Sequence, residues 1–259
     1  MKLSIVTVCL NSVETIEDTI KSVLIQDYED IEYIIVDGGS TDGTLDILTK
    51  YQSRISKCIS EPDNGIYDAM NKGIKLSNGD IIATLNADDV YADETIVGRM
   101  VEFMRSNGLD AAYGDLVYVD RNNIDRIARF WKAGLYKKGA FCYGWVMPHP
   151  TFFCQKKIFE KYGYFNEQFQ TAADFELMLR FIEKHLIKVG YLPKVIVKMR
   201  TGGRANVFRG MIRGNWEIIK SFRMNDVRLS PWFFILKPIA KISQLFTRQG
   251  KFNNKDIDL

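Results

Sequence analysis

The sequence predicts an α/β domain built around a mostly parallel sheet with helices on its faces. Three apolar runs rich in β-branched residues, at 3–8, 33–36 and 81–85, indicate buried strands. Polar turns follow these runs, and amphipathic helical segments separate them. This alternation of strand and helix is typical of a parallel sheet with right-handed crossovers.

Each element has a local signal. In the first helix, capped by Asn11 or Ser12, Ile16, Ile20 and Val23 fall on one face. The elements expected next are strand 33–36, a helix from Thr44, a helix at 67–76, strand 81–85, a helix at 95–105, strand 111–119, a turn at 120–125 into a strand at 126–131, an irregular aromatic segment at 141–153 and an amphipathic helix at 174–184.

Composition narrows the class of protein. The chain has 259 residues, 46% hydrophobic and 26% charged, which is typical of a globular protein and excludes a disordered one. The apolar part of the first residues is too short for a signal peptide. The sequence contains no run of about 20 apolar residues, so it predicts no membrane span. The four cysteines lack CxxC spacing, so we expect buried, reduced thiols in a cytoplasmic protein.

Charge is unevenly distributed. Residues 1–193 carry 21 Lys and Arg against 28 Asp and Glu, whereas residues 194–255 carry 14 against two. We therefore expect a domain at 1–203 and a basic helical extension at 204–259 that meets an anionic surface. On a helical wheel, apolar and basic residues of the extension take opposite faces, as in a helix at a membrane interface. The apolar face has Ile235, Ile239, Ile242 and Phe246, the basic face has Lys237, Lys241, Arg248 and Lys251, and the aromatic run 232–234 is the expected anchor. Packing on protein is the alternative.

Polar side chains follow the expected strands at one edge of the sheet. They are Asn11 after the first strand, Asp37 after the second, and Asn86, Asp88 and Asp89 after the strand at 81–85. Ligands of open α/β sheets bind at the carboxyl ends of the strands, so we expect these residues to form one site. Dinucleotide and P-loop patterns are absent from the sequence.

Four motifs in order carry a specific resemblance: SIVTVCLN, IIVDGGSTDGT, LNADD and TAADFELMLRF. Together they resemble the inverting family-two glycosyltransferases, which have the nucleotide-sugar-binding GT-A fold. The segment EPDNGIYDAMNKG and the pair Gly202-Gly203 resemble the bacterial members that build surface polysaccharides. The resemblance covers about residues 1–204.

The resemblance implies a donor-binding set. Val8 and Asn11 should frame the nucleotide pocket, and Asp37 should accept a hydrogen bond from the base; the alternative for Asp37 is a residue that closes its own turn. Asp68, Asn86 and Arg204 are the further expected contacts to the donor, with Asn86 on the ribose and Arg204 on the diphosphate.

The resemblance also implies the reacting groups. Asp88 should bind Mn²⁺ or Mg²⁺, although Asn86 stands where relatives carry a first carboxylate. Asp174 should be the general base, with an ordinary helix cap as the alternative, whereas Glu176 is expected to face solvent. Asp89 is expected to cap a helix or support the site. His149 and Trp145 are weaker candidates for the acceptor site, with structural packing as the alternative for both.

The expected function is that of a metal-dependent inverting hexosyltransferase. It would move a sugar from a nucleotide diphosphate to a lipid-linked oligosaccharide at the inner membrane surface, with no nucleic-acid partner. A nucleotidyltransferase and a non-catalytic sugar-binding homologue are the alternatives. The segment after the first strand lacks the glycine- and lysine-rich loop that a nucleotidyltransferase needs.

Overall fold

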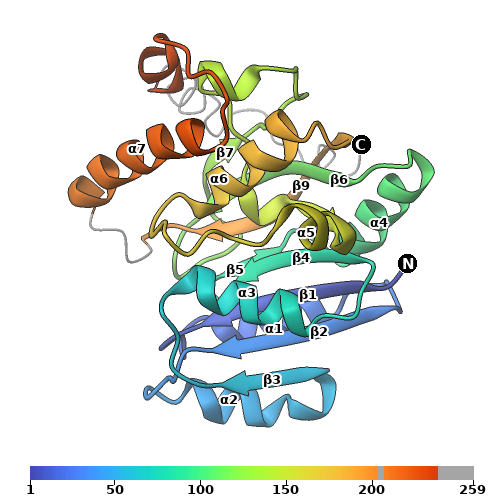
Figure 1. Cartoon of the computed structure of the whole chain (residues 1–259). Coiled ribbons are helices and arrows are strands. Elements are labelled where there is room, and N and C mark those ends of the chain that lie inside the picture. Colours follow the sequence, from blue (N-terminus) through green and yellow to red (C-terminus); the bar gives the residue numbers. More distant parts are fainter. Residues whose placement is uncertain (203–206, 239–259) are drawn as a thin grey trace.

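The computed structural model describes residues 1–202 and 207–238, and these form a mixed nine-stranded sheet with helices on both faces (Figure 1). The first half contains β1 (Leu3–Cys9), α1 (Ile16–Leu24), β2 (Ile31–Asp37), α2 (Thr44–Lys50), η1 (Gln52–Arg54), β3 (Lys57–Ser60), α3 (Ile66–Leu76), β4 (Ile81–Asn86), β5 (Asp89–Tyr91) and α4 (Ile96–Ser106). The second half contains β6 (Ala111–Val119), β7 (Ile127–Trp131), η2 (Ala140–Tyr143), η3 (His149–Thr151), β8 (Phe153–Gln155), α5 (Lys156–Tyr162), α6 (Ala173–Leu179), the π-helical η4 (Arg180–Lys184), β9 (Val189–Arg200) and α7 (Val207–Met224).

The strand order is β3-β2-β1-β4-β8-β6-β9-β5, with β7 paired to β6. Strands β1 to β4 are parallel to one another, as was predicted for β1, β2 and β4. The sheet beyond them is mixed rather than mostly parallel, because β8 and β5 pair antiparallel with their neighbours and β6–β7 is a hairpin. The α/β class is confirmed, and the antiparallel pairs all include a strand of the second half of the chain.

Two apolar cores lie on the two faces of the sheet because side chains alternate along each strand. Val6 and Val8 of β1 belong to one core, together with side chains of α3 and α6. Leu3 and Ile5 belong to the other, together with side chains of α1 and α4. Gly73 of α3 lets that helix approach β1 closely.

Some local expectations were wrong. The residue that precedes α1 is Thr15, and Asn11 instead adopts a positive φ of 50° in the loop after β1. The short strands β3, β5 and β8 were not predicted, nor was β9. Cys9 and Cys154 are buried, but Cys58 is exposed on the edge strand β3.

The first part of the basic extension packs on the domain. Helix α7 contacts α6, and Ile218, Phe222 and Phe233 are at most 5% exposed in the core on that side of the sheet. Of the expected aromatic anchor, Trp232 is 61% exposed whereas Phe233 is fully buried. The predicted interface helix beyond Pro238 lies outside the described residues.

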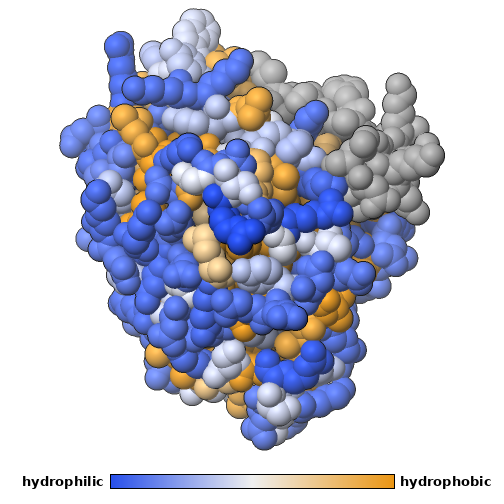
Figure 2. All heavy atoms as spheres, turned by 90° about the vertical axis from the view of Figure 1, so that its right-hand side faces the viewer, coloured by the Kyte–Doolittle hydropathy of each residue, from blue (hydrophilic) through white to orange (hydrophobic). Residues whose placement is uncertain are grey.

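The described residues contain no membrane-spanning helix, and the side that carries α4 has only small apolar patches (Figure 2). No helix of residues 1–202 and 207–238 has both the length and the apolar character that crossing a bilayer requires. The side that carries α4 in Figure 1 is mostly hydrophilic, with apolar side chains in small separate patches (Figure 2). Strands β2 and β3 point away from that side, so their carboxyl ends lie at the other edge of the sheet (Figure 1).

Candidate active site

The carboxyl ends of β1, β2 and β4 lie side by side. Val8 of β1 is paired with Val36 of β2 and with Asn86 of β4, and Cys9 is paired with Asp37. The predicted polar residues therefore emerge along one edge of three neighbouring strands. Val8 itself is buried beneath this edge.

Asp37 anchors the turn that follows β2. Its carboxylate accepts hydrogen bonds from the N–H groups of Gly39 (3.1 Å) and Ser40 (2.9 Å) and from the hydroxyls of Ser40 and Ser60, the latter at 2.7 Å; Cys9 Sγ approaches it at 3.5 Å. Burial raises the pKa of Asp37, but these hydrogen bonds outweigh it and lower the pKa. Asp37 is 0% exposed, and its carboxylate oxygens are used by its own turn. This position supports the turn-closing alternative.

Asn11 links the first two loops of the site. Its Oδ1 accepts a hydrogen bond from the N–H of Thr41 (2.8 Å), and its own N–H donates to Ser40 Oγ (2.7 Å). Asp68 lies in the first turn of α3, where it accepts a hydrogen bond from the N–H of Asn64 (2.9 Å) and faces Lys72 (3.4 Å). Both residues thus hold loops at the edge of the sheet.

The Asn86–Asp89 segment turns from β4 directly into β5. Asn86 Nδ2 donates to Asp89 Oδ2 (2.9 Å), while Asp88 is half-buried. Burial and the charge of Asp88 raise the pKa of Asp89, which is 0% exposed. Asp89 supports Asn86 and does not cap α4; Asp93 accepts the hydrogen bonds from Thr95 at the start of that helix.

Arg200, at the end of β9, holds the same turn and had no sequence signal beyond its charge. Its guanidinium donates to the carbonyl oxygens of Asp88 (3.0 Å) and Arg121 (3.1 Å) and to Asp18 Oδ2 (2.5 Å). The side chain is 5% exposed. Arg200 therefore joins the candidate metal-binding turn to β9, to α1 and to the loop after β6.

A cavity of about 220 Å³ opens beside this turn. It is lined by Ile66, Tyr67, Met70, Asn86, Tyr118, Trp131, Val146, Met147, His149, Pro150, Asp174 and Met199. Asn86 and Asp174, 88 positions apart in the sequence, thus face one space. A shallower depression on the outside of α4, lined by Asp27, Thr95, Gly98, Arg99, Glu102 and Phe103, contains no predicted site residue.

Asp174 is the second residue of α6 and is half-buried at the wall of the cavity. The hydroxyl of Tyr67 lies 3.3 Å from Asp174 Oδ1 and donates to it. Burial and the charge of Asp174 raise the pKa of Tyr67, so this hydroxyl keeps its proton. Burial lowers the pKa of His149, an effect that the charge of Asp174 opposes. Tyr67 was not predicted, because only the folded chain brings α3 against α6.

The structure corrects the expectation for Trp145. Its indole N–H donates to the carbonyl of Ala133 (2.8 Å), and its ring packs in the core against Tyr113, Tyr136 and Phe141. Trp145 does not line the cavity. His149 does line it, with its ring edge-on to Phe165. Arg204 lies outside the described residues.

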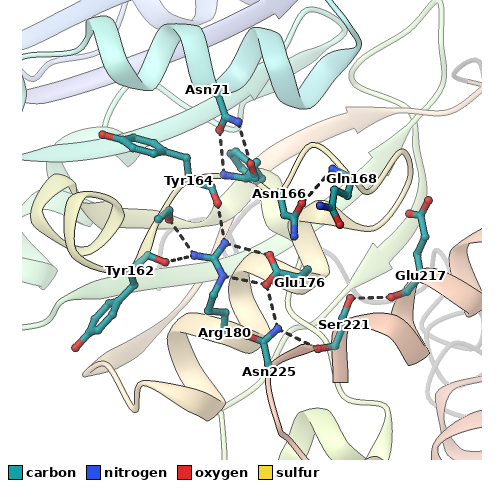
Figure 3. Close-up of polar contacts among 12 residues, drawn as sticks. Asn71, Tyr162, Tyr164, Asn166, Gln168, Glu176, Arg180, Glu217, Ser221 and Asn225 are labelled. Atoms are coloured by element: carbon teal, nitrogen blue, oxygen red, sulfur yellow. Dashed lines mark hydrogen bonds and ion pairs between the residues drawn. The ribbon is translucent and has the colours of Figure 1, made fainter. Parts of the chain in front are cut away.

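The expectation for Glu176 was also wrong. Glu176 is 3% exposed and forms a buried ion pair with Arg180, whose guanidinium also binds the carbonyl oxygens of Tyr162, Gly163 and Tyr164 (Figure 3). Asn225, which directly follows α7, donates to Glu176 Oε1 (3.0 Å). These contacts attach α6 to α7 and to the loop that follows α5.

Metal ligands are sparse in the described chain. Across residues 1–202 and 207–238, no three His, Cys, Asp or Glu side chains gather closely enough to hold a metal ion. Asp88 is the half-buried carboxylate of the turn beside the cavity, and Asn86 supplies an amide there.

Comparisons with known proteins agree with this architecture. The model of the family described as Glycosyl transferase family 2 matches residues 4–163. An uncharacterised glycosyltransferase of Mycobacterium tuberculosis is 32% identical over 186 residues, which are 69% of this chain and 68% of that protein. A PGL/p-HBAD biosynthesis glycosyltransferase of Mycobacterium bovis is 26% identical over 208 residues, 78% of each chain.

Two solved structures share the fold. S. aureus TarS 1–349 in complex with UDP-GlcNAc has a TM-score of 0.67 at 18% identity, and the match covers 87% of this chain and 65% of that one. Mannosyltransferase PcManGT from Pyrobaculum calidifontis, in complex with GDP-Man and Mn²⁺, has a TM-score of 0.65 at 16% identity, with 94% and 69% covered. The chain thus spans slightly less than two thirds of the TarS fragment. It has the GT-A fold and belongs to glycosyl transferase family 2.

Proposed function

We propose that this protein is an inverting hexosyltransferase that moves a sugar from a nucleoside diphosphate to a hydroxyl of a lipid-linked oligosaccharide in surface-polysaccharide biosynthesis. One observation carries the proposal: Asn86, next to the candidate metal ligand Asp88, and the candidate base Asp174 line the same cavity. A transferase needs this arrangement, because the departing diphosphate and the incoming hydroxyl must act on one carbon atom from opposite sides.

The cavity is large enough for only part of the donor, so we place the sugar inside it and the nucleotide outside it. Pockets for drug-sized ligands measure roughly 300–1,000 Å³, whereas this cavity measures about 220 Å³. We infer that it takes a single sugar unit. The nucleotide would then lie outside it, over the loops of Asn11 and Asn86 at the ends of β1 and β4. The nucleotide sugars held by the TarS and PcManGT structures make UDP- and GDP-sugars the first donors to test.

The chemistry of the proposed step is one in-line displacement. The acceptor hydroxyl attacks the anomeric carbon, the bond from that carbon to the diphosphate oxygen breaks, and Asp174 takes the hydroxyl proton. Tyr67 donates to Asp174 Oδ1 and so leaves the other carboxylate oxygen available for the acceptor. His149 in its neutral form would line the acceptor side without adding charge.

A divalent cation fits the site if the diphosphate supplies most of its ligands. Mg²⁺ is usually held by one or two carboxylates together with substrate phosphates, and the turn beside the cavity offers Asp88 with the amide of Asn86. When bound, Mg²⁺ or Mn²⁺ would stabilise the negative charge of the leaving diphosphate. We expect the cation to bind weakly without the nucleotide because Asn86 contributes no charge.

The basic extension supports a location at the inner membrane surface. Residues 194–255 carry 14 Lys and Arg against two acidic residues. Trp232, Ile235 and Leu236 are exposed where the described extension ends. Cationic and aromatic side chains together favour an anionic lipid surface, where a lipid-linked acceptor would reside.

The test combines binding with transfer. Thermal stabilisation is measured with UDP-, GDP- and dTDP-sugars, with and without Mn²⁺, and the stabilising donor is then used in a transfer assay with lipid-linked acceptors. We expect Asp174→Asn to keep the donor-dependent stabilisation and to lose transfer by about 10²–10⁴-fold. The matched control is Asp125→Asn, whose side chain is 85% exposed. Full transfer by Asp174→Asn would contradict the proposal, and release of pyrophosphate from a nucleoside triphosphate and a sugar phosphate would indicate a nucleotidyltransferase.

A further inference from the structure

Helix α7 binds the backbone of residues 170–172, the segment that leads into α6, through Glu217. The carboxylate of Glu217 accepts hydrogen bonds from three successive backbone N–H groups, those of Gln170 (3.0 Å), Thr171 (2.9 Å) and Ala172 (2.9 Å). It also accepts one from Thr171 Oγ1 (2.8 Å). Burial raises the pKa of Glu217, but the N–H groups outweigh this effect and lower it. The ionised carboxylate is therefore the form that holds the segment.

The local sequence does not hold this segment by itself. The residue that directly precedes α6, in the N-cap position, is Ala172, whose side chain has no hydrogen-bond acceptor. Glu217 lies 45 positions further along the chain and supplies the acceptor from outside. Asp174 follows two residues after the last N–H group that Glu217 binds, so a shift of the segment would shift Asp174.

Two further contacts leave α6 little freedom. Asn225, which directly follows the last residue of α7, is 3% exposed and donates to Glu176 of α6 (Figure 3). From the other side, Tyr67 of α3 donates to Asp174 itself. The base side chain is thus positioned directly by α3, while Glu217 of α7 holds the backbone before it and Asn225 holds the side chain of Glu176.

We propose that Glu217 is a positioning residue for Asp174, an inference that rests on the proposed role of Asp174 as general base. Glu217 fixes the backbone before α6 so that the carboxylate of Asp174 meets the acceptor hydroxyl in the cavity. The candidate donor and metal residues, Asn86 and Asp88, lie on the β4–β5 turn. Loss of Glu217 should therefore affect kcat and spare donor binding.

The experiment compares three substitutions with a matched control. Glu217→Ala removes all four hydrogen bonds. Glu217→Gln keeps the size, and its single acceptor oxygen can take the place of Oε2, which accepts from Thr171 and Ala172, but its amide N–H₂ is then turned toward the N–H of Gln170. It should therefore also lose activity, by no more than Glu217→Ala. Glu217→Asp keeps the charge one methylene group short of the segment. The control is Arg213→Ala, which removes a contact from α7 to the side chain of Gln170. It leaves the hydrogen bonds between Glu217 and the backbone of residues 170–172 intact.

We expect kcat for transfer to fall by about 10- to 100-fold in Glu217→Ala and Glu217→Gln, because small misplacements of a reacting group have effects of this size. Donor KM and donor-dependent thermal stabilisation should stay within about twofold, since donor groups are untouched. Glu217→Asp should fall between these variants and wild type, and Arg213→Ala should match wild type. Hydrogen exchange of the amides at 170–172 should accelerate in step with the loss of kcat.

Unchanged kcat in any folded Glu217 variant, or a parallel loss of donor binding, would overturn the inference. If Glu217→Ala and Glu217→Gln fail to fold, Glu217→Asp decides, and a wild-type kcat there overturns it. The proposed function fails separately, when wild type transfers no sugar or Asp174→Asn transfers as well as wild type. A wild type that is active, an inactive Asp174→Asn and normal Glu217 variants would refute the positioning role alone.

Discussion

Arg200 offers a way to measure how firmly the Asn86–Asp89 turn is held. In Arg200→Met the side chain keeps most of its apolar volume but loses the donors to the carbonyl oxygens of Asp88 and Arg121 and to the carboxylate of Asp18. A buried acceptor left without a partner costs about 1–3 kcal/mol, and the cost is smaller where water can replace the lost donor. Asp88 is half-buried and Arg121 is exposed, so the carbonyl of Asp88 should contribute more than that of Arg121. Asp18 is 48% exposed and can turn to water, so its share is at most about 1 kcal/mol. We therefore expect the free energy of unfolding to fall by about 3 kcal/mol.

Urea denaturation of wild type, Arg200→Met and Asp18→Asn measures these terms separately. Asp18→Asn breaks the ion pair but leaves both carbonyl contacts, so it should cost at most about 1 kcal/mol. Equal losses in the two variants would refute the reasoning, because they would place the energy in the ion pair and not in the bonds to the backbone. In Arg200→Met the Mn²⁺ concentration needed for donor-dependent stabilisation should also rise, since the turn that carries Asp88 is released; an unchanged Mn²⁺ requirement would limit Arg200 to a structural role.

Two further predictions concern the domain that carries the site. A Cβ added in Gly73→Ala would lie 2.3 Å from Val6 Cγ1, so the free energy of unfolding of this variant, measured by urea denaturation, should fall by about 1–3 kcal/mol. In Gly214→Ala the added Cβ makes only ordinary contacts, so the free energy of unfolding should rise by up to about 1 kcal/mol. The opposite ranking would contradict the close approach of α3 to β1. Burial raises the pKa of Glu32, but hydrogen bonds and Lys57 outweigh it and hold the pKa at about 2. Because this pKa lies below the unfolded value, Glu32 stabilises the fold above about pH 4.5, and that stability is lost as the pH falls toward 2. Between pH 7 and pH 3 wild type should lose about 2 kcal/mol more than Glu32→Gln, and parallel pH curves for the two proteins would show that Glu32 is not the group responsible.

The first 90 residues could be predicted well because their signals are local. The apolar runs that became β1, β2 and β4 are bounded by polar turns, and the helices between them show apolar residues at helical spacing. Short or interrupted strands gave weaker signals: β8 has three residues, and β9 contains Pro193. Their pairing depends on partners far along the chain, which a single sequence does not reveal.

The site could be predicted in part. The order of the motifs led to Asn86 and Asp174, which line one cavity. The same reasoning led to Asp37, which is buried, and to Trp145, which is half-buried with its indole N–H bonded to a backbone carbonyl. Residue type does not reveal whether a carboxylate or an indole is used by its own turn or core. Tyr67, Arg200 and Glu217 were missed for the complementary reason. Each acts on a segment remote in sequence, and a lone Tyr, Arg or Glu carries no motif.

The two sides of the cavity differ in how they are built. The proposed donor side rests on the parallel strands β1, β2 and β4, which lie, except for Leu3, within the 4–163 segment that the family model matches. The side that carries Asp174 begins after residue 163, and two of its supports are Glu217 of α7 and Asn225, which directly follows α7. A nucleoside diphosphate presents the same phosphates in every reaction, whereas acceptors differ in shape, so the two sides face different demands. We infer that changes in α6 and α7 can adapt the protein to a new acceptor while the donor side remains unaltered.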